Sequence, residues 1–523
     1  MKKIQNNISS VISQLRNSRF ANMFLLATIF IFCMFLYVDT TNYRLSGNDD
    51  DTFFKVSLDN YSVKDIFTKN VLLNNNIKTY YRPVLMISFL LDNTIAHSPT
   101  TLHFTNIILH FICCIILFVF LKRYFFDKAI SFWAVMFFAV CPINIFTVAW
   151  IPGRNDSLLC VFFLLSLIFF MEYLKSDKKI FLVLNLLSLT AAIFTKENSA
   201  IIPVICLCFW FMCGKKFSKE FWLVFLSQFC IVAVFFVIYS HFVDITNLSD
   251  RINSLIANIK MLFDYYSGVY LCNIHFSKYV SDRNFVLGII AFCMSIFFAG
   301  LCGLKTKDKI FYFVLPVLMI LPTLMIGQMF FQGNRVYIPL VFMLIPFVSF
   351  LQRYLSKRNV YIVLILLVIF SSFITVKYKK VFYNELTYLG TIDKEKPNAE
   401  IYIANLYSYN LLKYARLQEA SVKAYEIAEI TDYRNTYNLY VLSIINMHRK
   451  NFVQAIKYLE QILYFDNDVY TKLAVCYEKI GDDKAAQYYY NIVLSLNNNS
   501  VEIANKLIER EKECLAGKAK VAY

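Results

Sequence analysis

The first 376 residues of the chain alternate long apolar segments with short polar connections. A helix of about 20 apolar residues spans the hydrocarbon core of a bilayer, so the pattern predicts about eleven membrane-spanning helices. Composition agrees, because 58% of residues are hydrophobic and 17% are charged. The predicted fold class is a polytopic α-helical membrane protein. The apolar segments lie at roughly 20–38, 102–121, 129–149, 157–174, 180–195, 199–214, 221–241, 284–302, 310–328, 335–352 and 359–376.

Basic residues divide the loops into two alternating kinds. Five loops carry three Lys or Arg each, and the short loops between them carry one each. Cytoplasmic loops are enriched in Lys and Arg, so the N-terminus is predicted to be cytoplasmic, and the loop 39–101 and everything after about 377 to lie outside. The first apolar segment follows basic residues and precedes no cleavage pattern, which indicates a retained signal anchor. The basic residues are Lys2, Lys3, Arg16 and Arg19 at the N-terminus, then Lys122, Arg123 and Lys128, Lys175, Lys178 and Lys179, Lys215, Lys216 and Lys219, Lys305, Lys307 and Lys309, and Arg353, Lys357 and Arg358.

The net charge of +16 follows from this orientation signal. From residue 391 onward 17 Lys and Arg balance 17 Asp and Glu, so the excess lies in the membrane segment. The chain lacks a basic run with interleaved aromatic residues, and no nucleic-acid partner is expected. The 14 cysteines lie mostly inside apolar segments without metal-ligand spacing. They are interpreted as core residues; no cofactor is expected, and a divalent metal is possible but not indicated.

Polar residues suited to chemistry gather on the predicted outer side. His103, Asn106 and His110 follow a spacing of three and then four residues, which places them on one helical face. Polar groups on membrane helices usually face the bundle interior or a wet cavity, although Asn106 can also serve only to hold helices together. The outer loops add Asp49, Asp50 and Asp51, then Arg82, Arg154 and Asp156, then Lys196 and Glu197, and finally Arg335.

Carboxylates beside several cations at a bilayer surface suit a sugar carried on a polyprenyl phosphate. The cations would hold the phosphate and stabilise it as a leaving group. An aspartate would act as general base on an acceptor hydroxyl, and Asp50, with Asp49 or Asp51, is the first candidate. The other polar residues are then candidates for substrate binding. Taken alone, the triplet is equally compatible with a solvated acidic loop.

These motifs resemble the multi-span GT-C glycosyltransferases, most closely the branch with C-terminal tetratricopeptide repeats that includes the animal transmembrane O-mannosyltransferases acting on cadherins. The resemblance is carried by the first-loop acids, Tyr81-Arg82-Pro83, His103 to His110, Trp150 to Asp156 and Lys196-Glu197, with a weaker echo at Arg335-x-Tyr337-x-Pro339. It is strong over roughly 40–200. It implies a catalytic first-loop acid and a polyprenyl (dolichyl) phosphate sugar donor. Three consecutive acids leave the identity of the base open.

Beyond about residue 390 the chain becomes polar, with helical spacing of its apolar residues. Ala420, Ala455 and Ala486 are 35 and 31 residues apart, close to the period of about 34 of tetratricopeptide repeats. We therefore expect a membrane domain at 1–385 and an extracytoplasmic tetratricopeptide-like domain at 386–523. An unrelated set of helical hairpins is the alternative. Stacked repeats would offer a concave surface to an acceptor protein or another partner.

The sequence thus predicts a membrane glycosyltransferase that moves a sugar from a polyprenyl-phosphate donor to a hydroxyl of a protein or glycan on the extracytoplasmic face. Residue usage favours a bacterial inner (plasma) membrane. Two alternatives stay open. One is an oligosaccharide ligase or polymerase that uses a diphosphate-linked glycan. The other is a non-catalytic transporter or assembly scaffold, against which the apolar inner halves of the spans count.

Overall fold

The computed structural model describes residues 19–47, 49–50, 54, 61–69, 73–74, 77–78, 80–243, 247–277, 280–327, 331–395, 400–462, 466–496 and 509. Asp51 and the basic residues Lys2, Lys3 and Arg16 lie outside the described residues. The chain divides into two compact units, Met1–Asn384 and Glu385–Tyr523, and each is described by itself.

The first unit is built from helices whose bounds follow the apolar segments. It also has one minute hairpin, in which β1 (Leu73–Asn74) pairs antiparallel with β2 (Ile77–Lys78). The helices are α2 (Arg19–Tyr37), η1 (Val38–Asn42), α4 (Val63–Thr68), α5 (Pro83–Ile95), α6 (Pro99–Tyr124), α7 (Lys128–Val140), η3 (Pro142–Asn144), α8 (Ile145–Val148), η4 (Ile151–Gly153), α9 (Arg154–Ser176), α10 (Lys179–Thr195), η5 (Glu197–Ile201), α11 (Ile202–Met212), α12 (Lys219–Phe242), α13 (Leu248–Tyr270), α14 (Asp282–Leu301), α15 (Thr306–Leu324), η6 (Gly333–Val336), α16 (Tyr337–Tyr354), α17 (Lys357–Lys379) and η7 (Lys380–Tyr383).

Each of the eleven apolar segments is helical, with 129–149 divided among α7, η3 and α8, which confirms the predicted class of polytopic α-helical membrane protein. Among the described residues, seven helices are long and apolar enough to cross a membrane, and α7 with η3 and α8 forms an eighth candidate bent by 52°. α10 and α11 are shorter apolar helices. α15 is 19 residues long but has Lys307, Asp308 and Lys309 in its first turn. The two short helices and the charged start of α15 account for the difference between eight candidate spans and the eleven expected.

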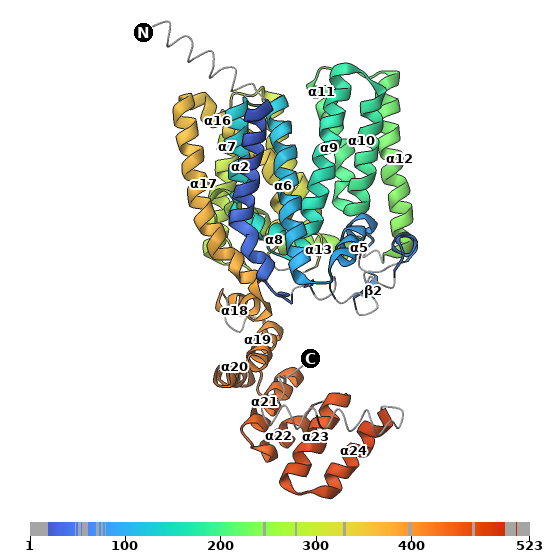
Figure 1. Ribbon diagram of the computed structural model, residues 1–523, viewed down its shortest axis with the longest axis vertical. Coiled ribbons are helices and arrows are strands. Elements are labelled where there is room, and N and C mark those ends of the chain that lie inside the picture. Colours follow the sequence, from blue (N-terminus) through green and yellow to red (C-terminus); the bar gives the residue numbers. More distant parts are fainter. Residues whose placement is uncertain are drawn as a thin grey trace. The chain divides into compact units, whose positions relative to one another are not determined.

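Burial separates the centre of this unit from its rim. In the span that contains α16, 78% of the most apolar stretch is buried, against 28% in α12, α14 and α17. α2 packs against α6 and α7, α17 packs against α7, and α10 lies between α9 and α12 (Figure 1). Large apolar side chains on the outer helices, such as Leu226 and Phe373, are exposed, as expected for surfaces that face lipid.

The two ends of this helical bundle hold different kinds of ion pair. At one end, partly exposed pairs link helix termini: Arg123 with Glu172, Lys215 with Asp177, and Lys357 with Asp127. These pairs belong to the loops that the charge pattern assigns to the cytoplasm. The opposite end contains the buried charges described below.

The second unit is a series of paired helices. Its helices are α18 (Glu385–Glu395), α19 (Ile401–Lys413), α20 (Leu417–Ile430), α21 (Thr436–His448), α22 (Phe452–Glu460), α23 (Asn467–Ile480) and α24 (Asp483–Leu496). Left-handed residues Ala415, Lys450 and Gly481 occupy the turns inside three successive pairs. Ala420 and Ala455 are fully buried where helices meet. This repetition accords with tetratricopeptide-like pairs, and the repeat assignment stays a prediction.

Candidate functional site

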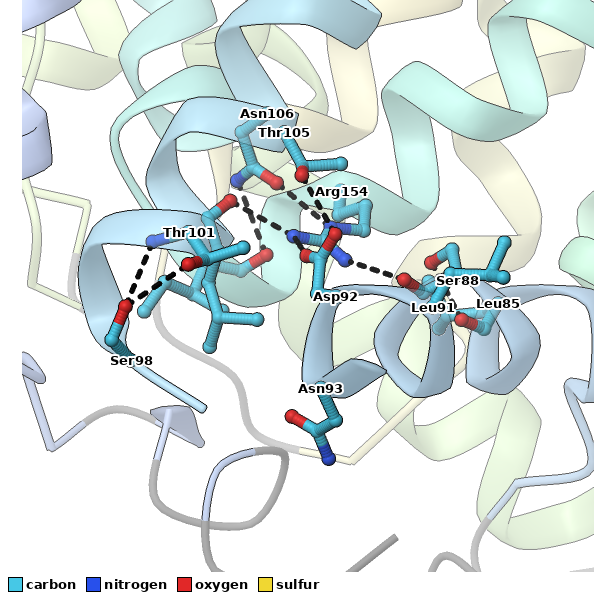
Figure 2. Close-up of polar contacts among 12 residues, drawn as sticks. Leu85, Ser88, Leu91, Asp92, Asn93, Ser98, Thr101, Thr105, Asn106 and Arg154 are labelled. Atoms are coloured by element: carbon cyan, nitrogen blue, oxygen red, sulfur yellow. Dashed lines mark hydrogen bonds and ion pairs between the residues drawn. The ribbon is translucent and has the colours of Figure 1, made fainter. Parts of the chain in front are cut away.

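Arg154 lies at the centre of a buried polar cluster that joins α5, α6 and α9 (Figure 2). It is the first residue of α9 and is fully buried. Its guanidinium lies 2.5 Å from Asp92 Oδ2, and its Nε donates to Asn106 Oδ1 at 2.9 Å. The remaining donors reach the carbonyl oxygens of Leu102 at 2.8 Å and Ser88 at 3.3 Å. The Arg154 guanidinium is therefore bound by four groups of the protein itself.

Asp92 is a member of this cluster that the sequence analysis missed. Thr105 donates to Asp92 Oδ1 at 2.7 Å, so both carboxylate oxygens have partners. Leu85, Phe89 and Asp92 recur at helical spacing and are buried on one face of α5, and the Phe89 ring lies 4.2 Å from the guanidinium carbon of Arg154. The signal was present in the sequence, because the apolar periodicity of residues 84–91 runs directly into Asp92.

A tight turn before α9 fixes the position of Arg154. Asn106 Nδ2 donates to the carbonyl oxygens of Trp150 and Ile151, at 3.0 and 3.3 Å. A Cβ placed on Gly153 would lie 2.2 Å from the carbonyl oxygen of Phe146. Only glycine permits this approach of two backbones, so Gly153 sets where α9 begins and hence where Arg154 points.

A second buried cluster connects α9, α10 and η6. Lys196 Nζ lies 2.7 Å from Asp156 Oδ1 and 3.0 Å from Asn155 Oδ1. Asn334 donates to the other carboxylate oxygen of Asp156 at 2.6 Å. Burial lowers the pKa of Lys196, and the carboxylate of Asp156 opposes that shift. The predicted residues Lys196 and Asp156 thus form one ion pair, and Asn334 is an addition to the predicted set.

Arg335 and Asp156 line the same small pocket, which has a volume of about 20 Å³ and also includes Asn198. The guanidinium of Arg335 donates to Gln332 Oε1 at 2.8 Å and to the carbonyl oxygen of Thr323 at 3.1 Å. The volume is close to that needed for one ordered water. The pocket brings a predicted cation and a predicted carboxylate, 179 residues apart in the chain, to one place.

Arg82 and Glu197 form a two-pronged ion pair beside the second cluster. Arg82 Nε and a terminal nitrogen donate to the two carboxylate oxygens of Glu197 at 3.0 and 2.6 Å. The Tyr80 ring stacks 4.2 Å from the guanidinium carbon. Burial acts to raise the pKa of Glu197, but the Arg82 charge and hydrogen bond hold it below its ordinary value. Both side chains are therefore charged near neutral pH.

Asp49 and Asp50, the two described members of the acidic triplet, follow Ser46 closely in the chain. Asp50 is buried and accepts hydrogen bonds from the Ser46 amide at 2.5 Å and the Ser46 hydroxyl at 2.7 Å. Asp49 is exposed and has a left-handed backbone, with φ of 63°. Partial desolvation nevertheless raises the pKa of Asp49. Asp51 lies outside the described residues.

His103 connects this segment to α6. The Tyr43 ring, three residues before Ser46, packs edge-on against the buried His103 ring with centroids 6.0 Å apart. Neither ring nitrogen of His103 has a hydrogen-bond partner among the described residues. His103 is thus a buried polar side chain close to the segment that carries the aspartates.

His110 shares the buried face of α6 with His103 but has different surroundings. Its Nε2 lies 3.0 Å from the carbonyl oxygen of Ala139, and its Nδ1 lies 2.6 Å from the Tyr337 hydroxyl. A carbonyl can only accept, so Nε2 carries the proton and Nδ1 accepts from Tyr337. The described contacts of His110 therefore join α6 to α7 and α16.

A buried acid–imidazole pair joins α13 to the segment that follows it, and the sequence analysis missed it as well. His275 Nε2 contacts the carboxylate of Asp264, which is fully buried. Ser267 also donates to Asp264 Oδ1, at 3.2 Å. The His275 ring packs against Phe331, the residue before Gln332. The pair therefore lies behind the segment that leads to Arg335, and its spacing of eleven residues gave no helical or motif signal.

No known protein-family profile matches the chain. Parts of it are similar to curated proteins from mammals. The human protein O-mannosyl-transferase TMTC1 is 30% identical over 158 residues, which cover 27% of this chain and 18% of that protein. The mouse protein O-mannosyl-transferase TMTC3 is 33% identical over 135 residues, which cover 24% of this chain and 14% of that protein. The chain thus has a distant, partial similarity to these proteins, and the matched region spans less than a fifth of their length.

Proposed function

We propose that the chain is a membrane glycosyltransferase that transfers a sugar from a polyprenyl-phosphate donor to a hydroxyl of a protein or glycan on the extracytoplasmic face. The observation that carries this proposal is the similarity to protein O-mannosyl-transferases over about a quarter of the chain. The convergence of separate polar motifs at one end of a bundle of apolar helices supports it. A lipid-linked donor would place its phosphate at that end and its tail among the exposed apolar side chains.

We assign the phosphate to the neighbourhood of Arg335 and Lys196. Arg335 and Asp156 line one pocket, and Asp156 is the ion-pair partner of Lys196. A guanidinium can bind two phosphate oxygens at once and can stabilise the charge that grows on them as the sugar departs. Asn334 donates to Asp156 and would fix the carboxylate that pairs with Lys196.

Arg154 and Arg82 receive positioning roles in this proposal. Arg154 is fully buried among Asp92, Asn106 and two backbone carbonyls. Arg82 is held by both oxygens of Glu197. Each would fix the helix ends around the donor, with His103 and Asn106 forming the wall toward the sugar.

Asp49 is our choice of general base within the triplet, because it is the exposed carboxylate and Asp50 is held by Ser46. In the reaction, the acceptor oxygen bonds to the anomeric carbon and its proton passes to the aspartate. The bond from that carbon to the phosphate oxygen breaks and releases polyprenyl phosphate. A general base must be ionised, so activity falls as pH drops through its pKa. The raised pKa of Asp49 moves the acidic limb of the pH–activity profile to higher pH.

The test uses full-length protein in membranes supplied with a polyprenyl-phosphate [³H]mannose donor, and measures label transferred to acid-precipitable acceptors together with released polyprenyl phosphate. Asp49→Asn is expected to lower transfer at least 100-fold. Ser46→Ala and Asp50→Asn are expected to lower transfer to a similar extent as each other, because each disturbs the hydrogen bonds between Ser46 and Asp50. Asp282→Asn, which changes an acid at the start of α14, is the matched control and should retain wild-type transfer.

Lipid competition separates the donor classes. Polyprenyl phosphate should inhibit wild-type protein more strongly than polyprenyl diphosphate; the reverse order would favour a ligase or polymerase that uses diphosphate-linked glycans. Full transfer by variants with Asn at 49, 50 and 51 together would overturn the assignment of the base. Absence of turnover with mannose, glucose and galactose donors alike would overturn the proposed reaction.

A further inference from the structure

Two membrane helices bring together a set of soft metal ligands that the proposed transfer reaction does not use. Cys33 of α2 and His110 and Cys114 of α6 place a sulfur, a ring nitrogen and a second sulfur within 4.8 Å of one another. All three residues are buried. His110 and Cys114 are four residues apart, so they share a helical face, and α2 packs directly on α6. No sequence motif marks this group, because its members come from two separate apolar segments.

The hydrogen bonds of His110 suit a metal ligand. A ligating histidine usually donates its other ring N–H to a carbonyl or carboxylate, which fixes the tautomer. Here Nε2–H donates to the carbonyl oxygen of Ala139 at 3.0 Å, so the lone pair lies on Nδ1. Nδ1 accepts from the Tyr337 hydroxyl at 2.6 Å, so the Tyr337 ring must tilt away from Nδ1 when a metal binds there. Such a movement of one side chain is smaller than a change in the helices.

A further polar group adjoins the cluster. Tyr37 follows Cys33 by four residues on α2, and its ring packs edge-on against the His110 ring at 5.7 Å. Tyr37 is fully buried, and its hydroxyl has no hydrogen-bond partner among the described residues. A buried hydroxyl without a partner costs free energy. A metal centre would give it a role as oxygen ligand or as donor to a thiolate.

Charge selects the metal. Burying net charge in a medium of low dielectric constant is costly. Two thiolates, a neutral imidazole and a divalent ion sum to zero, whereas a monovalent ion would leave one negative charge. Sulfur and nitrogen ligands favour zinc among divalent ions. We propose that Cys33, His110 and Cys114 bind a structural zinc ion that ties α2 to α6.

Such a clamp would lie on the helix that leads into the segment with the aspartates. α2 continues through η1 to Tyr43 and Ser46, and η1 also packs on α6. Fixing α2 against α6 would therefore fix where that segment leaves the bundle. This consequence does not depend on the reaction, because zinc binding is measured without any sugar donor.

The test is the metal content of full-length protein purified in detergent from zinc-supplemented cultures, measured by plasma mass spectrometry. Wild-type protein should contain about one zinc per chain. Cys33→Ser and Cys114→Ser should lower this at least tenfold, and Cys206→Ser, which changes a buried cysteine of α11, should leave it unchanged. Retention of zinc by both cluster variants would overturn the proposal.

A second measurement needs no variant and so does not depend on the folding of one. Wild-type protein from cobalt-supplemented cultures should show the visible bands of tetrahedral Co(II) with sulfur-to-cobalt charge transfer. Wild-type protein without zinc and without these bands, or with Cys33 and Cys114 oxidised to a disulfide in the intact mass, would overturn the proposal.

Discussion

Removal of the Arg154 guanidinium is the most informative perturbation of the helical bundle. Arg154→Met keeps the unbranched apolar stem of the side chain and leaves Asp92 buried without its charge partner. Asn106 Oδ1 and the carbonyl oxygens of Leu102 and Ser88 lose a donor at the same time. One substitution thus disturbs α5, α6 and α9 together.

The expected loss is large because Arg154 is completely buried. Removing one partner from a buried ion pair costs about 3–5 kcal/mol, mostly through the charge left behind. Asp92→Asn neutralises that charge, so the double variant should be more stable than the two single losses predict, with a coupling of about 1–3 kcal/mol. Lys357→Met is the matched control, because Lys357 pairs with Asp127 while 52% exposed. Exposed pairs contribute less than about 1 kcal/mol.

The assay is equilibrium unfolding of the purified protein in mixed micelles with increasing dodecyl sulfate, followed by tryptophan fluorescence and circular dichroism. Arg154→Met should unfold at a clearly lower detergent fraction than Lys357→Met. A loss below about 1 kcal/mol for Arg154→Met, or additive effects of Arg154→Met and Asp92→Asn, would refute the view that this ion pair holds the helix ends together.

Three further changes test other parts of the bundle. Gly153→Ala should destabilise by about 3 kcal/mol or more, because its Cβ would meet the Phe146 carbonyl oxygen, while Gly300→Ala, with no atom within 4 Å, should fold normally in thermal unfolding. In metal-free protein, Tyr337→Phe should cost about 1–3 kcal/mol by removing the donor to buried His110, and equal stability would contradict that bond. Because the pKa of Glu197 is depressed, its ion pair with Arg82 stabilises the fold above the unfolded pKa of about 4.3, and this stabilisation is lost as pH falls through the lower folded pKa. Glu197→Gln removes this titration, so the free energy of unfolding of the variant should depend less steeply on acid pH.

Much of the architecture could be predicted because it depends on local pattern. Every predicted apolar segment became a helix, since run length and spacing act within one segment. The number of spans was harder to predict, because α10 and α11 are short and α15 carries three charged residues in its first turn. Where one helix bends against its neighbours depends on contacts that the segment itself does not contain.

The sequence predicted many residues of the candidate site but not which of them pair with one another. Lys196, Asp156, Arg82 and Glu197 were predicted because cations and carboxylates on one predicted side of the membrane suit a lipid-linked phosphate sugar. The partners could not be read in the same way. Asp92 lies 62 residues before Arg154, at the end of a helix that resembled a simple apolar stretch.

The sequence by itself determined that apolar helices carry polar groups near one predicted side, because hydrophobicity and helical period are properties of consecutive residues. Only the tertiary structure decided which charge neutralises which: Arg154 with Asp92, and Lys196 with Asp156. It also brought Cys33 beside His110 across two helices. Ion pairs and metal ligands require contacts of a few ångströms, and helix packing sets those distances between segments far apart in the chain.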